Sequence, residues 1–128
     1  MITNKQKEKL ISKMIKSKGF TLKLNLQEPK HKSGYYVSIT NNKNRQISDF
    51  MFNKIAFQLK NFKNMPRFNN RELYLGFWKN GINKYLDVTL FCNKREIALM
   101  LGNEFKQLAI FDIKGSTSIN LNDNLTKN

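Results

Sequence analysis

The stretch that most constrains the fold of this chain is residues 84–115, which has the pattern of a strand, a helix and a second strand. In its first part, apolar residues alternate with others at Leu86, Val88 and Leu90, as in a half-buried strand. Residues 108–113 form an almost continuous apolar run, which predicts a second strand covered on both faces. We expect this unit to be the scaffold of the protein.

A helix is predicted between these two strands. Asn93 is followed three residues later by Glu96, which matches a capping box at the start of a helix. A strand–helix–strand connection of this length suits a crossover between parallel strands. The sheet is therefore expected to contain parallel as well as antiparallel neighbours.

The rest of the chain alternates between short strands and helices. A helix is expected to begin at Thr3, with Gln6 completing its capping box, and a second to begin after Ser48. Periodicity and turn residues place helices at 1–18 and 49–64, strands at 20–27, 35–40 and 73–79, a turn at 41–45 and a hairpin turn at 80–81. Ile119 and Leu121 suit a short edge strand before a polar, frayed end.

These elements predict an α+β fold with a mixed sheet, in the order α-β-β-α-β-β-α-β, and with helices mainly on one face. We expect a single domain over residues 1–128, since 128 residues suit one core. Its expected parts are a basic helix at 1–18, a ββα unit at 19–64, a ββαβ unit at 73–115 and a tail at 116–128.

The charge is strongly unbalanced. Lys and Arg number 23 against 9 Asp and Glu, a formal net charge of +14. Residues 1–64 hold 14 basic and 3 acidic groups, and residues 65–128 hold 9 and 6. An AT-rich genome would explain many of the lysines but not the shortage of glutamate. Such an excess attracts polyanions, so we expect nucleic acid or a ribonucleoprotein as the partner.

Several classes of protein are disfavoured. The one cysteine, Cys92, allows neither an internal disulfide nor a thiol metal cluster. No apolar run approaches the ~18 residues of a membrane span, and no secretory signal is recognisable. We expect a cytoplasmic protein with no cofactor, no metal, no membrane partner and no small-molecule substrate.

The residues that carry chemistry are too scattered to predict an enzyme. Asp87, Asp112 and Lys114 match a nuclease pattern superficially, but a helix separates the two strands concerned. Both aspartates are instead expected to bind backbone amides. His31 is the only histidine, and Cys92 is expected to be buried rather than reactive.

Lysines interleaved with aromatic residues predict a binding surface instead. Bases stack on aromatic side chains mounted on a sheet, and lysines neutralise phosphates. The predicted interface residues are Lys5, Lys9, Lys13, Lys16, Lys30, Lys32, Tyr36, Trp78, Lys79 and Lys84. The lysines of the first helix also fit an ordinary solvated face, and half of the aromatic residues are expected to face the core, Tyr35 above all. Phe50 and Phe57 lie on a second side of their helix, which is therefore either deeply buried or in contact with something else.

Five segments carry a resemblance to known proteins. They are residues 34–38, 75–78, 85–88, 95–99 and 107–113, which read GYYVS, LGFW, YLDV, REIAL and QLAIFDI. Together they resemble a recurring type of short, uncharacterised phage and plasmid accessory protein. The resemblance implies a mobile-element origin and a bacterial host cytoplasm, and it implies no particular chemistry. It also motivates an alternative function, inhibition of a host defence system, such as an anti-CRISPR that binds a CRISPR effector complex.

Overall fold

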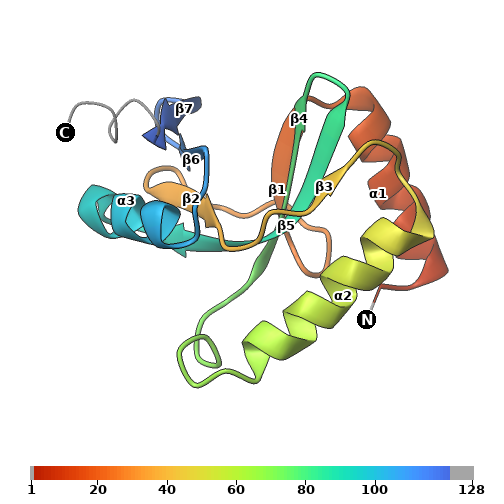
Figure 1. Ribbon diagram of the computed structural model, residues 1–128, viewed down its shortest axis with the longest axis horizontal. Helices are drawn as coiled ribbons and strands as arrows, with labels where there is room; N and C mark the ends of the chain where they lie inside the picture. Colours follow the sequence, from red (N-terminus) through yellow and green to blue (C-terminus); the bar gives the residue numbers. More distant parts are fainter. Residues whose placement is uncertain (1, 122–128) are drawn as a thin grey trace.

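The computed structural model describes residues 2–121, and its longest strand, β5 (Asn83–Cys92), organises the sheet. Within the described chain the sheet runs β1 (Gly19–Lys23), β4 (Tyr74–Asn80), β5, β2 (Tyr35–Ser38), β6 (Ala109–Asp112), β7 (Thr117–Asn120). The short strand β3 (Lys43–Asn44) pairs with β5 on the same edge as β2 does. The first half of β5 thus belongs to one arm of a curled sheet, and its end belongs to the other (Figure 1).

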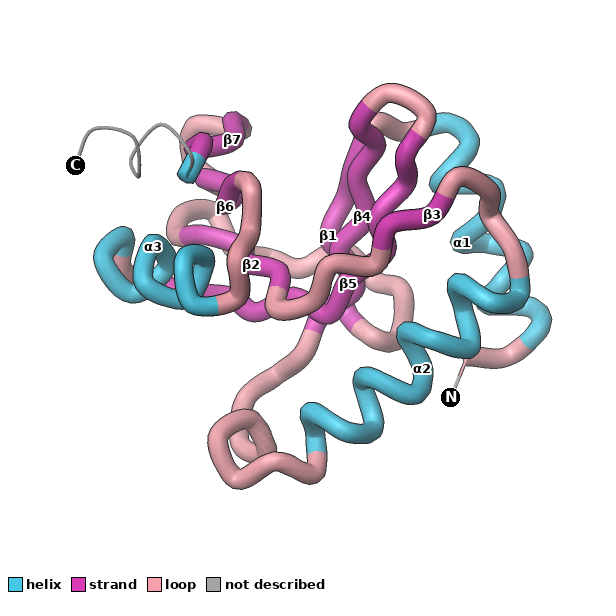
Figure 2. Tube along the Cα trace, viewed as in Figure 1, coloured by secondary structure: helices cyan, strands magenta, loops and turns pink. Residues whose placement is uncertain are grey.

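Three helices among the described residues cover the sheet: α1 (Asn4–Lys16), α2 (Asp49–Lys63) and α3 (Arg95–Glu104). They lie outside the two arms, while strands and loops line the inner side (Figure 2). Core side chains under the helices include Met14, Ile55, Leu86 and Val88, all fully buried. The α+β class is confirmed.

The local helix signals are confirmed at two of three sites. In α1, Thr3 Oγ1 accepts a hydrogen bond from the Gln6 backbone N–H at 3.1 Å, and Gln6 Oε1 accepts one from Thr3 N–H at 3.0 Å. Ser48 occupies the N-cap of α2, although its side chain makes no capping bond. The Asn93 prediction is wrong, because Lys94 is the N-cap of α3 and no side chain caps it.

The predicted mixed sheet is also wrong. Every strand pair of the described chain is antiparallel. β5 and β6 do run parallel, as the crossover requires, but β2 lies between them and pairs with both. The strand–helix–strand pattern predicts β6 as the neighbour of β5, but β2, from much earlier in the sequence, occupies that position.

Two further predictions need correction around the edges of the sheet. β6 is not covered on both faces, since Phe111 and Leu108 beside it are 38% and 43% exposed. Residues 41–45, expected to be a turn, contain β3. The edge strand predicted near Ile119 is confirmed as β7. The frayed end predicted for the tail lies at residues 122–128, outside the described residues.

Candidate nucleic-acid interface

The inner side of the curled sheet holds a groove of about 940 Å³. It is bounded by β1 and β4 on one side, by β6, β7 and the turn between them on the other, and by the loop at 28–31. Side chains with polar groups that line it include Lys18, Thr21, Glu28, His31, Tyr36, Ser38, Trp78, Thr89, Ser116, Thr117 and Ser118. The groove is half open to solvent and large enough for a ligand of several rings.

The pleat of the strands decides which side chains reach this groove. Successive residues of a strand point to opposite faces, so the face opposite Leu86 and Val88 carries Asp87 and Thr89. Gly76 is the cross-strand partner of Asp87. A Cβ at Gly76 would lie well inside van der Waals contact with Thr89 Oγ1, so only glycine leaves room for Thr89 here. Gly76, Thr89 and Ser38 together form the floor of the groove.

One end of this inner face is closed by a stacked aromatic pair. Trp78 and Tyr85 are cross-strand partners in the β4–β5 hairpin, and their rings stack with centroids 4.4 Å apart and an interplanar angle of 9°. Trp78 is partly exposed and lines the groove. The hairpin turn places Gly81 at a positive φ of 62°, which glycine adopts without strain.

The other end is closed by three aromatic rings around His31. The imidazole stacks on Phe91, with ring centroids 3.7 Å apart and an interplanar angle of 5°. Its Nδ1 lies 2.9 Å from the Tyr36 hydroxyl oxygen, and its edge contacts Tyr74. Burial raises the pKa of Tyr74 to about 12, with help from Glu72, and also raises the pKa of Tyr36. His31 thus pins the loop to the sheet.

His31 is the residue that sequence reasoning undervalued. A lone histidine in a basic loop carries no periodic signal, and the strand that it contacts, β5, lies some sixty residues further along the sequence. The alternation of β5 does place Phe91 on the same face as Thr89. This alternation is the one signal in the sequence that places Phe91 on the face that His31 contacts.

The structure brings only part of the predicted interface together. Tyr36, Trp78 and Lys79 are all among the residues that line the groove. Lys79 and Lys84 are cross-strand partners whose side chains alternate to the helix side of the sheet. There Lys79 Nζ donates to the Ile15 carbonyl at 3.3 Å, and Lys84 Nζ donates to the Arg45 carbonyl at 2.8 Å.

The remaining predicted lysines divide between α1 and the loop that holds His31. Lys30 and Lys32 flank His31, which lines the groove, and both are exposed. On α1, Lys5, Lys9 and Lys16 are exposed, whereas Lys13 lies 3.6 Å from Glu28 Oε1, over the Phe20 ring. Lys18, which the sequence analysis did not select, lines the groove.

The carboxylates that resembled a nuclease site have structural partners. Asp87 Oδ1 accepts hydrogen bonds from the Asn42 backbone N–H at 2.7 Å and from Thr40 Oγ1 at 2.6 Å. Asp112 Oδ1 accepts one from Gly115 N–H at 3.4 Å, in the β6–β7 turn. Cys92 is buried. Among residues 2–121, no group of three His, Cys, Asp or Glu side chains is arranged to hold a metal ion.

Comparison with protein-family models, curated proteins and solved structures found no match to this chain. The fold and the groove therefore define its class on their own. It is a small α+β protein whose curled antiparallel sheet carries helices outside and an aromatic-ended groove inside. Within the described range, no helix is long and apolar enough to cross a membrane.

Proposed function

We propose that this protein is a non-enzymatic binder of single-stranded nucleic acid, either free or within a ribonucleoprotein, and that the strand lies in the groove. The observation that carries the proposal is the pair of aromatic groups at the two ends of one open groove. A +14 chain attracts phosphates from any direction. Aromatic faces in a groove select unpaired bases, because a duplex keeps its bases stacked inside.

The dimensions of the groove suit a few nucleotides. Trp78 pairs with Tyr85 and Tyr36 pairs with Phe91, so the two aromatic ends are six residues apart on β5. At about 3.4 Å per residue this is at most about 20 Å along the strand. Lys18 lines the groove, and the exposed Lys30 and Lys32 flank His31 in the loop that bounds it; these three lysines would supply charge for the phosphates.

The test is a titration by fluorescence anisotropy with labelled single-stranded and double-stranded RNA and DNA oligonucleotides at low salt. Trp78→Ala should weaken single-strand binding about tenfold or more, since stacking is worth about 1–3 kcal/mol per base. Phe57→Ala is the matched control, because this exposed aromatic residue lies on α2, away from the groove. The absence of binding to every oligonucleotide would refute the proposal.

The salt dependence gives a second readout. If Lys18, Lys30 and Lys32 each neutralise one phosphate, a plot of the logarithm of the binding constant against the logarithm of the salt concentration should have a slope of about −2 for a single strand. Replacing Lys18 by Gln should make that slope shallower by about 0.7. The same replacement at Lys84, whose amine donates to a backbone carbonyl, should leave the slope unchanged.

We further propose a mobile-element origin and a bacterial host cytoplasm as the place where the protein acts. The resemblance to short phage and plasmid proteins supports the origin. The single, buried cysteine supports a reducing compartment, since it leaves the fold independent of disulfides. Fractionation of host cells that express a tagged protein tests the location.

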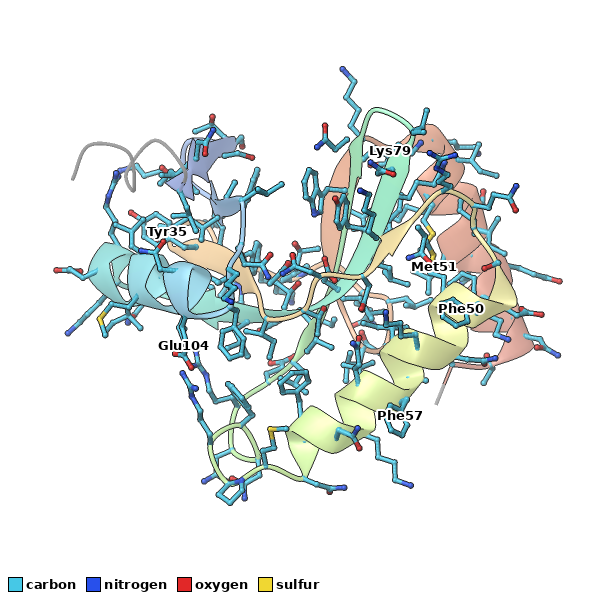
Figure 3. All side chains as sticks on the ribbon, viewed as in Figure 1. Tyr35, Phe50, Met51, Phe57, Lys79 and Glu104 are labelled. Atoms are coloured by element: carbon cyan, nitrogen blue, oxygen red, sulfur yellow. The ribbon has the colours of Figure 1, made fainter. Side chains whose placement is uncertain are left out.

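A second candidate function is inhibition of a host defence system through protein contact, as by an anti-CRISPR that binds a CRISPR effector complex. The outer face of α2 favours it. Phe50 and Phe57 are 67% and 66% exposed on that helix, and Lys54 Nζ lies 6.0 Å from the Phe50 ring centroid. Figure 3 labels both rings, with Phe57 turned away from the sheet. Of the two predicted alternatives for this helix, deep burial is therefore wrong for these two side chains.

Pull-down from host lysate before and after nuclease treatment separates the two functions. Retention of one protein after nuclease, lost in Phe50→Ser/Phe57→Ser and kept in Trp78→Ala, would favour the inhibitor. Loss of all bound material with nuclease would favour direct binding of nucleic acid.

A further inference from the structure

The floor of the groove carries a directed chain of hydroxyl groups. Ser38 and Thr89 face each other in the β2–β5 register, and their hydroxyl oxygens are 3.3 Å apart. Thr89 Oγ1 donates its hydrogen to the Asp87 carbonyl at 3.3 Å. The contact itself allows either hydroxyl to donate; because Thr89 uses its one hydrogen for the Asp87 carbonyl, we take Ser38 as the donor to Thr89.

This direction fixes what the floor offers to a ligand. Thr89 is only 2% exposed, whereas Ser38 is partly exposed and lines the groove. Because the hydrogen of Ser38 points to Thr89, its oxygen presents lone pairs to the groove. The floor therefore favours a ligand group that donates a hydrogen bond. A phosphate diester, which has acceptors only, does not fit there.

The position of Ser38 indicates which part of a strand meets it. Along β5 its partner Thr89 lies between Tyr85, under Trp78, and Phe91, beside Tyr36. Bases stacked at the two aromatic ends would leave the linking sugars over the floor, with the phosphates toward solvent and the exposed Lys18. The sugar group that donates hydrogen bonds and distinguishes RNA from DNA is the 2′-hydroxyl.

We propose that Ser38 Oγ accepts a hydrogen bond from a ribose 2′-hydroxyl, with Thr89 as the positioning residue, and that this contact gives the groove a preference for RNA. The inference rests on the proposed function, because it assigns the ligand class of the same groove. Gly76 belongs to the arrangement, since its missing Cβ leaves the space that Thr89 Oγ1 occupies.

The experiment compares three labelled eight-nucleotide strands that share the uracil base: uridine, deoxyuridine and 2′-fluoro-deoxyuridine. The fluoro sugar keeps an RNA-like pucker without the hydroxyl donor, so it separates the hydrogen bond from sugar shape. The wild type should bind the uridine strand about fivefold more tightly than either of the others, the value of one hydrogen bond. Equal affinity for all three would overturn the inference and leave single-strand binding standing.

Two variants and a control locate the effect. Ser38→Ala should abolish the uridine preference without weakening deoxyuridine binding, and Thr89→Val should reduce it by freeing the Ser38 hydroxyl. Ser12→Ala, which removes an exposed hydroxyl on α1 outside the groove, should keep the preference. Circular dichroism checks that each variant folds. A preference that survives in Ser38→Ala refutes the assignment, and failure of the wild type to bind any strand refutes the proposed function with it.

Discussion

Asp87 provides the sharpest test of the structure, because it is a carboxyl group with little solvent and few partners. It is 1% exposed, and its Oδ1 accepts hydrogen bonds from Thr40 and Asn42. Its Oδ2 has no hydrogen-bond partner within the described residues. Burial outweighs the two hydrogen bonds and raises the pKa of Asp87 to about 6, from an ordinary value of 3.8.

A raised carboxyl pKa makes the folded state bind its proton more tightly than the unfolded chain does. The stabilisation is complete below the unfolded pKa of 3.8 and is lost as the pH rises through about 6. The shift of roughly two units corresponds to about 3 kcal/mol at 1.36 kcal/mol per unit. We therefore expect Asp87 to lower the free energy of unfolding by about 3 kcal/mol between pH 3.5 and 7.5.

The variant Asp87→Asn isolates this effect, because an amide oxygen keeps the acceptor for Thr40 and Asn42 while the charge is removed. Urea unfolding, followed by the fluorescence of Trp78, gives the free energy of unfolding at each pH. Repulsion among the lysines changes with pH in both proteins and largely cancels in the difference. The wild type should lose about 3 kcal/mol relative to Asp87→Asn as the pH rises.

The control is Asp112→Asn, at a carboxylate that binds a backbone amide in the β6–β7 turn. It removes one carboxyl charge from a turn, and its difference from the wild type is recorded across the same pH range as that of Asp87→Asn. If Asp87→Asn ran parallel to the wild type, Asp87 would be solvated in the folded state. The buried hydrogen-bond geometry described above would then be wrong.

Four other substitutions test separate parts of the structure. Gly76→Ala should lower the unfolding free energy by about 1–3 kcal/mol in urea titrations, because the new Cβ displaces Thr89 Oγ1. An unchanged value would contradict the close approach of Thr89 to the backbone of Gly76. Thr3→Ala should cost about 1 kcal/mol by the same measurement through loss of the α1 capping box. Phe50→Ser and Phe57→Ser should each change the free energy of unfolding by no more than about 0.5 kcal/mol, since both rings are exposed. Thermal unfolding should therefore show almost the same midpoint as the wild type. A large loss at either position would place that ring in the core.

Local signals in the sequence predicted the helices well and the sheet order poorly. The Thr3–Gln6 box and the span of α2 depend on residues within one or two helical turns of each other, so a short window contains them. The order of the strands depends on contacts between distant segments. The insertion of β2 between β5 and β6 joins residues about fifty to almost eighty positions apart, and no periodicity in the sequence indicates it.

The same limit explains the candidate site. Alternation alone places Trp78 and Lys79 on opposite faces of β4, but it does not say which face the helices cover. α1 covers the face of Lys79, so the amine of this lysine binds the Ile15 carbonyl even though the residue borders the groove, whereas Trp78 lies on the groove face. Charge and aromatic content predicted a basic, aromatic binding surface, and tertiary packing determines which of the predicted residues lie on it.

The groove itself arises from a break in the sheet that Asp87 maintains. β2 pairs with the end of β5 and β3 with its start, on the same edge, and between them residues 40–42 leave the ladder. Asp87 binds both Thr40 and Asn42 across that break, where the two arms of the sheet diverge (Figure 1). Such interruptions bend a strand and increase its twist. A carboxylate that first suggested catalysis thus shapes the floor on which Ser38 and Thr89 lie, and its protonation and the binding of RNA should be measured together.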